Sequence, residues 1–115
     1  MKKLYRIKKS KDIEQVLKKK KSVGNKNYII YIMKNSEAKN FRLATSVSKK
    51  LGKAVVRNRQ KRLINQVFTK HLNEIHPFDI FVIARSNSIT LTYDEVESNI
   101  IYLLNKIDVL IKENK

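Results

Sequence analysis

The chain has 115 residues, a length typical of one domain that buries a real hydrophobic core. It carries 26 Lys and Arg against 10 Asp and Glu, for a formal net charge of +16, and it contains no cysteine. The absence of cysteine excludes disulfides, thiolate nucleophiles and zinc–thiolate sites, and it fits a reducing compartment, so we expect the protein in the cytoplasm. No run of about 18 apolar residues is present and no apolar stretch follows the basic N-terminus, so neither a membrane span nor a signal peptide is expected.

The positive charge is confined to one part of the chain. Residues 1–62 hold 21 Lys and Arg against 3 Asp and Glu, a net of +18, whereas residues 63–115 hold 5 against 7, a net of −2. A compact domain with so much charge of one sign repels itself unless a polyanion neutralises it. We therefore expect a structured RNA as the partner. Membrane attachment is disfavoured, because the basic segments lack a large apolar insertion face and a lipidation motif.

The first expected element is a helix that starts at Ser10, as its capping residue, and ends at Lys20. Its apolar residues Ile13, Val16 and Leu17 share one face, at the spacing i, i+3, i+4.

Three strands are expected after this helix. Residues 27–34 and 41–48 are of strand length and composition, and the turn-forming stretch between them predicts a hairpin. Apolar side chains occupy both faces of the first of these strands, so both faces should be covered. A near-continuous apolar run over residues 79–85 follows the only proline, Pro77, and indicates a central, buried strand.

Two more helices complete the pattern. One covers residues 54–72, with an apolar side and a basic back. The other begins at a capping box formed by Thr92 and Glu95. The order helix, strand, strand, helix, strand, helix predicts one domain over residues 1–115, an α/β (α+β) fold with a mixed sheet covered by helices on one face.

Cationic density peaks in the segment VSKKLGKAVVRNRQKR, residues 47–62, where seven of 16 residues are basic. Arginine forks hold phosphate oxygens in pairs, lysines add point charges, and a helix N-terminus adds partial positive charge. A charged helix face is often merely solvated, but here no acid stands at i±3 or i±4 to neutralise the arginines. The pattern therefore favours phosphate binding.

No signature of chemistry by the polypeptide itself is present. The chain has no Gly-rich phosphate loop, since it contains only Gly24 and Gly52, and no nucleophile elbow or paired carboxylates. His71 and His76 are five residues apart, which does not align two metal ligands on a helix, so both are expected to be surface residues.

Residues 46–64, SVSKKLGKAVVRNRQKRLI, closely resemble the signature of the protein subunit of bacterial ribonuclease P. The likeness extends over roughly residues 5–107 and includes Arg6-Ile7-Lys8-Lys9, Asp12, Ser22-Val23-Gly24-Asn25, Tyr31 and Ile83-Ala84-Arg85. The resemblance implies a two-layer α/β sandwich like the second domain of ribosomal protein S5, in which the Arg-Asn-Arg helix makes a left-handed βαβ crossover. Most such crossovers are right-handed, so patterning alone favours the other sense.

The resemblance also implies a function. The protein would assist a catalytic RNA in removing the 5′ leader from precursor tRNA. The RNA subunit would carry the chemistry with Mg²⁺ that it holds itself, so the chain would have no catalytic residue and no metal ligand of its own.

The binding residues implied by the resemblance and by the charge pattern fall into two groups. Contacts with the RNA subunit are expected from Lys49, Lys50, Lys53, Arg57, Asn58, Arg59, Lys61 and Arg62. Contacts with the single-stranded leader, in a cleft between the first helix and the sheet, are expected from Ile13, Leu17, Lys18, Ile29, Tyr31 and Arg57. Where Ile13 and Leu17 stand the family commonly has phenylalanine, and an aliphatic side chain offers no π face for stacking, so leader stacking should be weaker.

Two other classes of protein are compatible with a small basic chain. A ribosomal-type structural RNA-binding protein would share its size and charge. A protein-only nuclease would need clustered metal-binding carboxylates, and the basic part of the chain offers only Asp12, Glu14 and Glu37.

Overall fold

The computed structural model of the protein describes residues 2–111, and its centre is a four-stranded mixed sheet in the order β1-β2-β4-β3. The strands are β1 (Ser22–Gly24), β2 (Tyr28–Lys34), β3 (Arg42–Ser46) and β4 (Phe78–Ala84). β1 and β4 both pair antiparallel with β2, while β3 pairs parallel with β4. The apolar run after Pro77 therefore forms a central strand, as its composition predicted.

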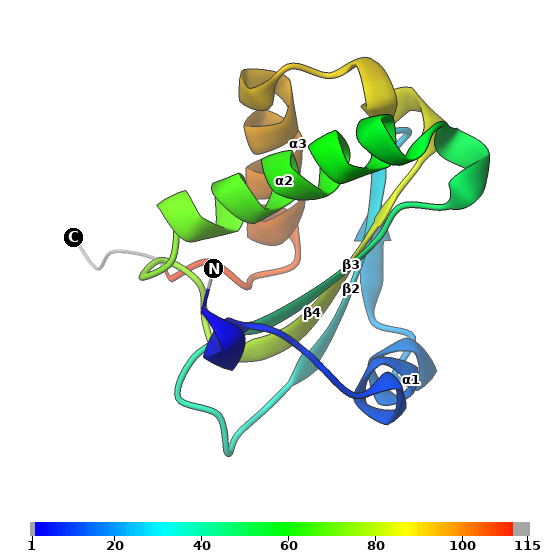
Figure 1. The fold of residues 1–115 in the computed structure, drawn as a ribbon. Coiled ribbons are helices and arrows are strands. Elements are labelled where there is room, and N and C mark those ends of the chain that lie inside the picture. The colour runs from blue at the N-terminus through cyan, green and yellow to red at the C-terminus, as the bar shows by residue number, and fades with distance from the viewer. Residues whose placement is uncertain (1, 112–115) are drawn as a thin grey trace.

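Helices cover both faces of this sheet. They are α1 (Ser10–Lys18), α2 (Ala54–Lys70) and α3 (Tyr93–Lys106), with short 3₁₀ turns η1 (Lys3–Tyr5), η2 (Lys49–Leu51) and η3 (Ser86–Thr90). Helices α2 and α3 lie on one side of the sheet and α1 lies on the other (Figure 1). The expectation that helices cover a single face is wrong for α1, because β2 and β4 also present apolar side chains on the second face.

The connection from β3 through α2 to the parallel neighbour β4 is the βαβ unit that places the Arg-Asn-Arg helix over the sheet. It crosses in the left-handed sense, as Figure 1 shows with β3 in front of β4 and α2 above both strands. This is the minority sense for such units. The fold is therefore the α/β sandwich that the resemblance implied.

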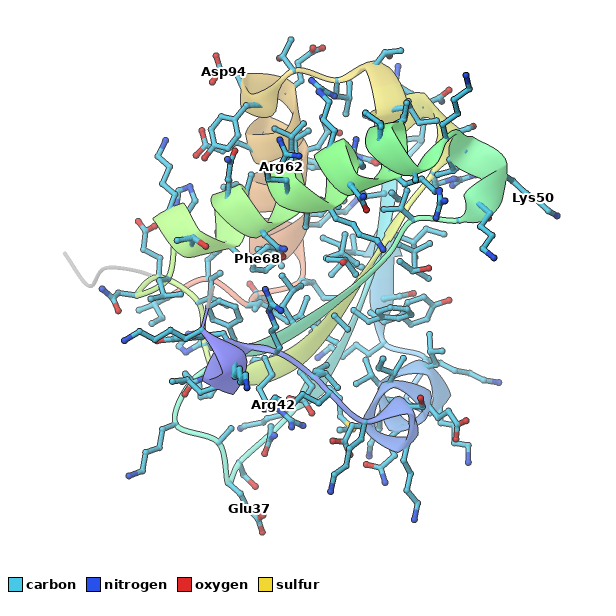
Figure 2. All side chains as sticks on the ribbon, in the orientation of Figure 1. Glu37, Arg42, Lys50, Arg62, Phe68 and Asp94 are labelled. Carbon is cyan, nitrogen blue, oxygen red and sulfur yellow. The ribbon has the colours of Figure 1, made fainter. Side chains whose placement is uncertain are left out.

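The main core lies between the sheet and helices α2 and α3. Alternate residues of β2, namely Tyr28, Ile30 and Ile32, are fully buried there. They pack in one cluster with side chains from α2, among them Phe68, and from α3. Figure 2 shows Phe68 between α2 and the sheet. Each fully buried side chain of this size contributes about 1.5–3 kcal/mol, so the core fixes how α2 sits on the sheet.

A smaller apolar cluster fills the space between α1 and the opposite face. Ile7, Val16 and Phe81 are buried in it, and the second alternating set of β2, which includes Tyr31 and Met33, packs against them. Both faces of β2 are thus covered, as its alternation predicted.

Two local predictions are wrong. The strands β2 and β3 do not form a hairpin, because β4 lies between them and pairs with both. The first helix ends at Lys18 rather than Lys20, since Lys20 takes a positive φ of 55°, and its N-cap is Lys9, so Ser10 lies inside the helix and caps nothing. The capping box at Thr92 and Glu95 is confirmed at the start of α3.

Candidate nucleic-acid interface

The turn that leads into α2 depends on Gly52. Its φ of 149° is a conformation that side chains rarely adopt, and a Cβ there would lie 3.3 Å from Cγ1 of Val56. Just before it, the Ser48 side-chain oxygen accepts a hydrogen bond of 3.2 Å from the backbone N–H of Lys50. These two features present η2 and the first turn of α2 as one continuous surface.

The helix then begins without a side-chain cap. Lys53 is its N-cap and makes no side-chain hydrogen bond to the helix, so the first backbone N–H groups keep their partial positive charge. We call the residues predicted to contact the RNA subunit the basic surface. It comprises Lys49, Lys50, Lys53, Arg57, Asn58, Arg59, Lys61 and Arg62, all on η2, the turn or α2.

Exposure differs among the members of the basic surface. Most are exposed, whereas Arg57 and Lys61 are half-buried. Figure 2 shows Lys50 extending away from the body of the protein near the start of α2. The structure therefore brings the predicted residues together along one side of the molecule.

Two arginines of the basic surface also make structural hydrogen bonds. The Arg57 Nε donates to the Gly52 carbonyl at 3.1 Å. Arg59 donates to the carbonyls of Ile89 and Leu91 at 3.5 and 3.3 Å, and so ties the η3 segment to α2. Arg57 lies with the other predicted RNA-subunit contacts at the start of α2, and Arg59 also holds the η3 segment in place.

The charges of the basic surface are not neutralised by acids. Within residues 2–111, none of the ion pairs involves any of its lysines or arginines. Arg6, which was not among the predicted contacts, lines a hollow of about 260 Å³ together with Lys61 and Asn65. The surface therefore continues across β3 to the N-terminal segment, and the Arg6-Ile7-Lys8-Lys9 motif is the signal for that extension.

Gln60 lies beneath the basic surface. Its side chain is polar, so the apolar periodicity of the helix does not indicate that it is buried. It is only 1% exposed. The Tyr28 hydroxyl donates to Gln60 Oε1 at 2.7 Å, and Gln60 Nε2 donates to the Ser88 carbonyl at 2.7 Å. Burial raises the pKa of the Tyr28 hydroxyl, so this group stays a neutral donor. These bonds tie Gln60, the residue after Arg59, to both the sheet and η3.

The residues predicted to contact the leader form a second surface, which we call the α1 face: Ile13, Leu17, Lys18, Ile29 and Tyr31. Ile13, Leu17 and Tyr31 are half-buried and pack against the cluster of Ile7, Val16 and Phe81. Ile29 lies on the same side of β2 as Tyr31, and Lys18 is exposed in the last turn of α1. The structure thus gathers these five residues around α1 and places Arg57, the sixth, with the basic surface.

An ion cluster anchors the start of α1 to the sheet. Arg42 donates through Nε and Nη2 to the two oxygens of Asp79, at 2.9 and 2.7 Å, and its Nη1 lies 3.6 Å from Asp12. The hydrogen bond to Asp79 raises the pKa of Arg42 further above its ordinary value. Because Asp79 is only 1% exposed, this pairing holds Arg42 in a fixed position beside the start of α1.

His71 is half-buried at the protein surface and joins α2 to α3. Its Nε2 lies 2.9 Å from Oε2 of Glu97, its Nδ1 contacts Glu74, and Lys70 also pairs with Glu97 at 2.9 Å.

Within residues 2–111, no group of three or more His, Cys, Asp or Glu is arranged to hold a metal ion. Over the same residues, no helix combines the length and the apolar character needed to cross a membrane.

Comparison with known proteins assigns the family. The family model described as "Ribonuclease P" matches residues 1–108. The ribonuclease P protein component of Macrococcus caseolyticus is 48% identical over 104 residues, which cover 90% of this chain and 90% of that protein. The chain belongs to the ribonuclease P protein family. The protein component of a Geobacillus species, 44% identical over 116 residues and 100% of both chains, agrees with this assignment.

Solved structures of the ribonuclease P protein family share the fold. The ribonuclease P protein of Staphylococcus aureus superposes with a TM-score of 0.87 at 40% identity, over 93% of this chain and 98% of that one. The protein from Thermotoga maritima superposes with a TM-score of 0.79 at 27% identity, over 94% and 98%. This chain is the RNA-binding subunit of ribonuclease P, the endoribonuclease that matures the 5′ end of tRNA, and the ribosomal-type alternative is not favoured.

Proposed function

We propose that the basic surface docks the catalytic RNA subunit of ribonuclease P. The observation that carries this proposal is the set of lysines and arginines on η2 and α2 that form no ion pair within residues 2–111. Such groups gain most from a partner with regularly spaced phosphates, because binding releases the counterions condensed on the RNA. The core and the Gln60 hydrogen bonds hold them in one geometry, which suits a folded RNA rather than a flexible one.

The α1 face is proposed to bind the 5′ leader of precursor tRNA. It combines half-buried apolar side chains with the Tyr31 ring and the exposed Lys18. An aromatic ring stacks an unpaired base, and a lysine attracts the phosphate that follows it. Ile13 and Leu17 supply contact area without a π face, so we expect Tyr31 to contribute most of the stacking on this surface.

Magnesium is proposed to belong to the RNA subunit. Ribonuclease P is a metal-dependent ribonucleoprotein, and the side chains of residues 2–111 offer no cluster of oxygen ligands that suits Mg²⁺. The role of the protein would be electrostatic. Its cations at the RNA surface would neutralise phosphates that otherwise repel one another where metal ions bind. In this account the RNA carries the cleavage step.

The docking proposal is tested by the salt dependence of binding to the RNA subunit. Arg62 is the sharpest probe, because its side chain is exposed and takes part in no ion pair within the described residues. We expect Arg62→Gln to weaken binding and to reduce the slope of log K against log salt by about one unit, and Arg57→Ala to weaken it as well. Lys39→Gln, an exposed charge outside the basic surface, is the matched control. Unchanged slopes for both arginine variants would refute direct phosphate contact.

The leader proposal is tested with precursors that carry or lack a leader. We expect Tyr31→Ala in the reconstituted enzyme to weaken binding of the precursor with a leader by about 1–3 kcal/mol and to leave mature tRNA unaffected. Tyr31→Phe keeps the ring and is the control for stacking. Equal effects on both RNAs would refute leader binding at this surface.

A further inference from the structure

A hollow of about 700 Å³ lies away from the basic surface, where the ends of two helices meet the sheet. The end of β2, the start of β4, the residues after α1 and the C-terminal turn of α3 surround it. Its lining consists of Lys19, Lys21, Ile32, Met33, Lys34, Phe78, Lys106, Ile107 and Asp108. We call it the lysine hollow.

The lining is strongly cationic. All four lysines are exposed, and Asp108 is the one acid among the lining residues. Within residues 2–111, none of the ion pairs involves these lysines. Lys106 has its Nζ 5.9 Å from the centre of the Tyr102 ring, which holds the ammonium at the rim. With four lysines against one acid, the lining of the hollow carries a net positive charge.

The rest of the lining is apolar and includes an aromatic ring. Phe78, Met33 and Ile107 are half-buried and present part of their surface to the hollow. Ammonium groups around an aromatic and aliphatic floor are the chemistry that binds single-stranded RNA, because phosphates meet the charges and a base meets the ring. The volume also falls within the roughly 300–1,000 Å³ of ordinary ligand sites.

The position of the hollow favours the leader over the RNA subunit as its source of nucleotides. Tyr28 at the start of β2 bonds to Gln60 on α2, whereas Lys34 at the other end of β2 lines the hollow. Seven residues of strand separate these two ends by about 20 Å. The hollow is instead adjacent to the α1 face: Lys19 directly follows Lys18, and Met33 belongs to both the lining and the cluster beneath α1.

We propose that the lysine hollow binds a nucleotide of the precursor leader that lies further from the cleavage site than those held by the α1 face. This inference rests on the proposed leader function of that face. A leader that leaves Tyr31 passes the C-terminal turn of α1 and enters the hollow, where the ammonium groups hold its phosphates and Phe78 meets a base.

Leader length tests the inference. The double variant Lys34→Gln/Lys106→Gln removes two charges of the hollow and leaves both the α1 face and the basic surface intact. In the reconstituted enzyme it should bind a precursor with a long leader about fivefold more weakly than wild type and bind a precursor with a minimal leader equally well. The double variant Lys26→Gln/Lys39→Gln removes two exposed charges elsewhere and should leave binding of both precursors unchanged.

The outcomes separate the two proposals. If Tyr31→Ala has no effect with either precursor, the leader function of the α1 face fails, and this inference fails with it. A different result is that Tyr31→Ala weakens binding of the precursor with a leader while the lysine-hollow variant binds like wild type or binds both precursors equally more weakly. In that case only the inference about the hollow is overturned.

A cross-link identifies the source of the nucleotide directly. The chain has no cysteine, so Lys34→Cys provides one unique site for a photoreactive label. We expect the labelled holoenzyme to cross-link to the far part of a long leader. Cross-linking to the RNA subunit, or to no RNA, would overturn the proposal.

Discussion

The Tyr28 hydroxyl donates a 2.7 Å hydrogen bond to Oε1 of Gln60, and both side chains are almost completely buried. Tyr28 comes from the central sheet and Gln60 from the helix that carries the Arg-Asn-Arg motif. A second bond from Gln60 to the Ser88 carbonyl completes a chain from sheet to helix to η3. The orientation of α2 is therefore specified by directional polar contacts as well as by apolar packing.

Replacing Gln60 alone should destabilise the protein. In Gln60→Leu the Tyr28 hydroxyl loses its partner while it stays buried, so we expect the free energy of unfolding to fall by about 1–3 kcal/mol. Urea denaturation measures this change.

The matched control is the double variant Tyr28→Phe/Gln60→Leu, which removes both polar partners. The Ser88 carbonyl still accepts from the backbone N–H of Leu91 at 3.1 Å, so nothing in the site is left unpaired. We expect its stability to return to within about 1 kcal/mol of wild type. A double variant less stable than Gln60→Leu would contradict the polar chain.

The pairings of Arg42 with Asp79 and with Asp12 should differ strongly in their contribution to the free energy of unfolding. Arg42→Ala leaves the buried Asp79 carboxylate without its cation, and we expect a loss of about 3 kcal/mol in the free energy of unfolding. Asp12 is 3.6 Å from Arg42 and more exposed, so Asp12→Asn should cost less than about 1 kcal/mol. Equal losses in thermal or urea denaturation would show that this assignment of the cluster is wrong.

Glu97 should make stability depend on pH at the acidic end. Its hydrogen bond from Lys70, and then that from His71, lowers the pKa of the Glu97 carboxyl below its ordinary value. A carboxyl with a depressed pKa in the folded state stabilises the fold above its unfolded-state pKa, and that stabilisation is lost as the pH falls through the folded-state value.

We therefore expect wild type to lose more stability than Glu97→Gln between about pH 6 and about pH 3. Denaturation curves at several pH values compare the two proteins. Glu14→Gln, on the exposed side of α1, is the control and should follow the wild-type profile. A Glu97→Gln profile parallel to wild type would exclude this carboxyl as a source of the pH dependence.

Residues 1–115 are proposed to form one cooperative domain. α1 contacts β2 and β4, and α2 and α3 pack on the same two strands through the main core, so local unfolding of either layer should disturb the other. Far-ultraviolet circular dichroism and tyrosine fluorescence should report one coincident transition in urea. Separate transitions for the two signals would indicate independent units.

The capping box of α3, the central strand β4 and the basic back of α2 were predictable from sequence, because each depends on neighbouring residues or on local periodicity. The hairpin prediction failed because the turn residues after β2 are equally compatible with a connection to a non-adjacent strand. Only long-range pairing shows that β4 fills the position between β2 and β3. β1 was missed because its three residues, Ser22–Gly24, are too few for a periodic signal.

The candidate sites show the same division. The basic surface was predictable because its charged residues lie close together in the sequence. Gln60 was not, because its polar side chain breaks the apolar stripe, and its buried role depends on Tyr28, 32 residues away. The lysine hollow was also out of reach, since its lining comes from four separate segments that only the fold brings together.

Reconstitution at low magnesium tests the central claim most directly. The RNA subunit alone should cleave precursor tRNA poorly there, because its phosphates repel one another when few cations are present. We predict that adding the protein restores cleavage, and that Arg62→Gln restores it less well at the same protein concentration. Absence of stimulation by the wild-type protein would contradict the account.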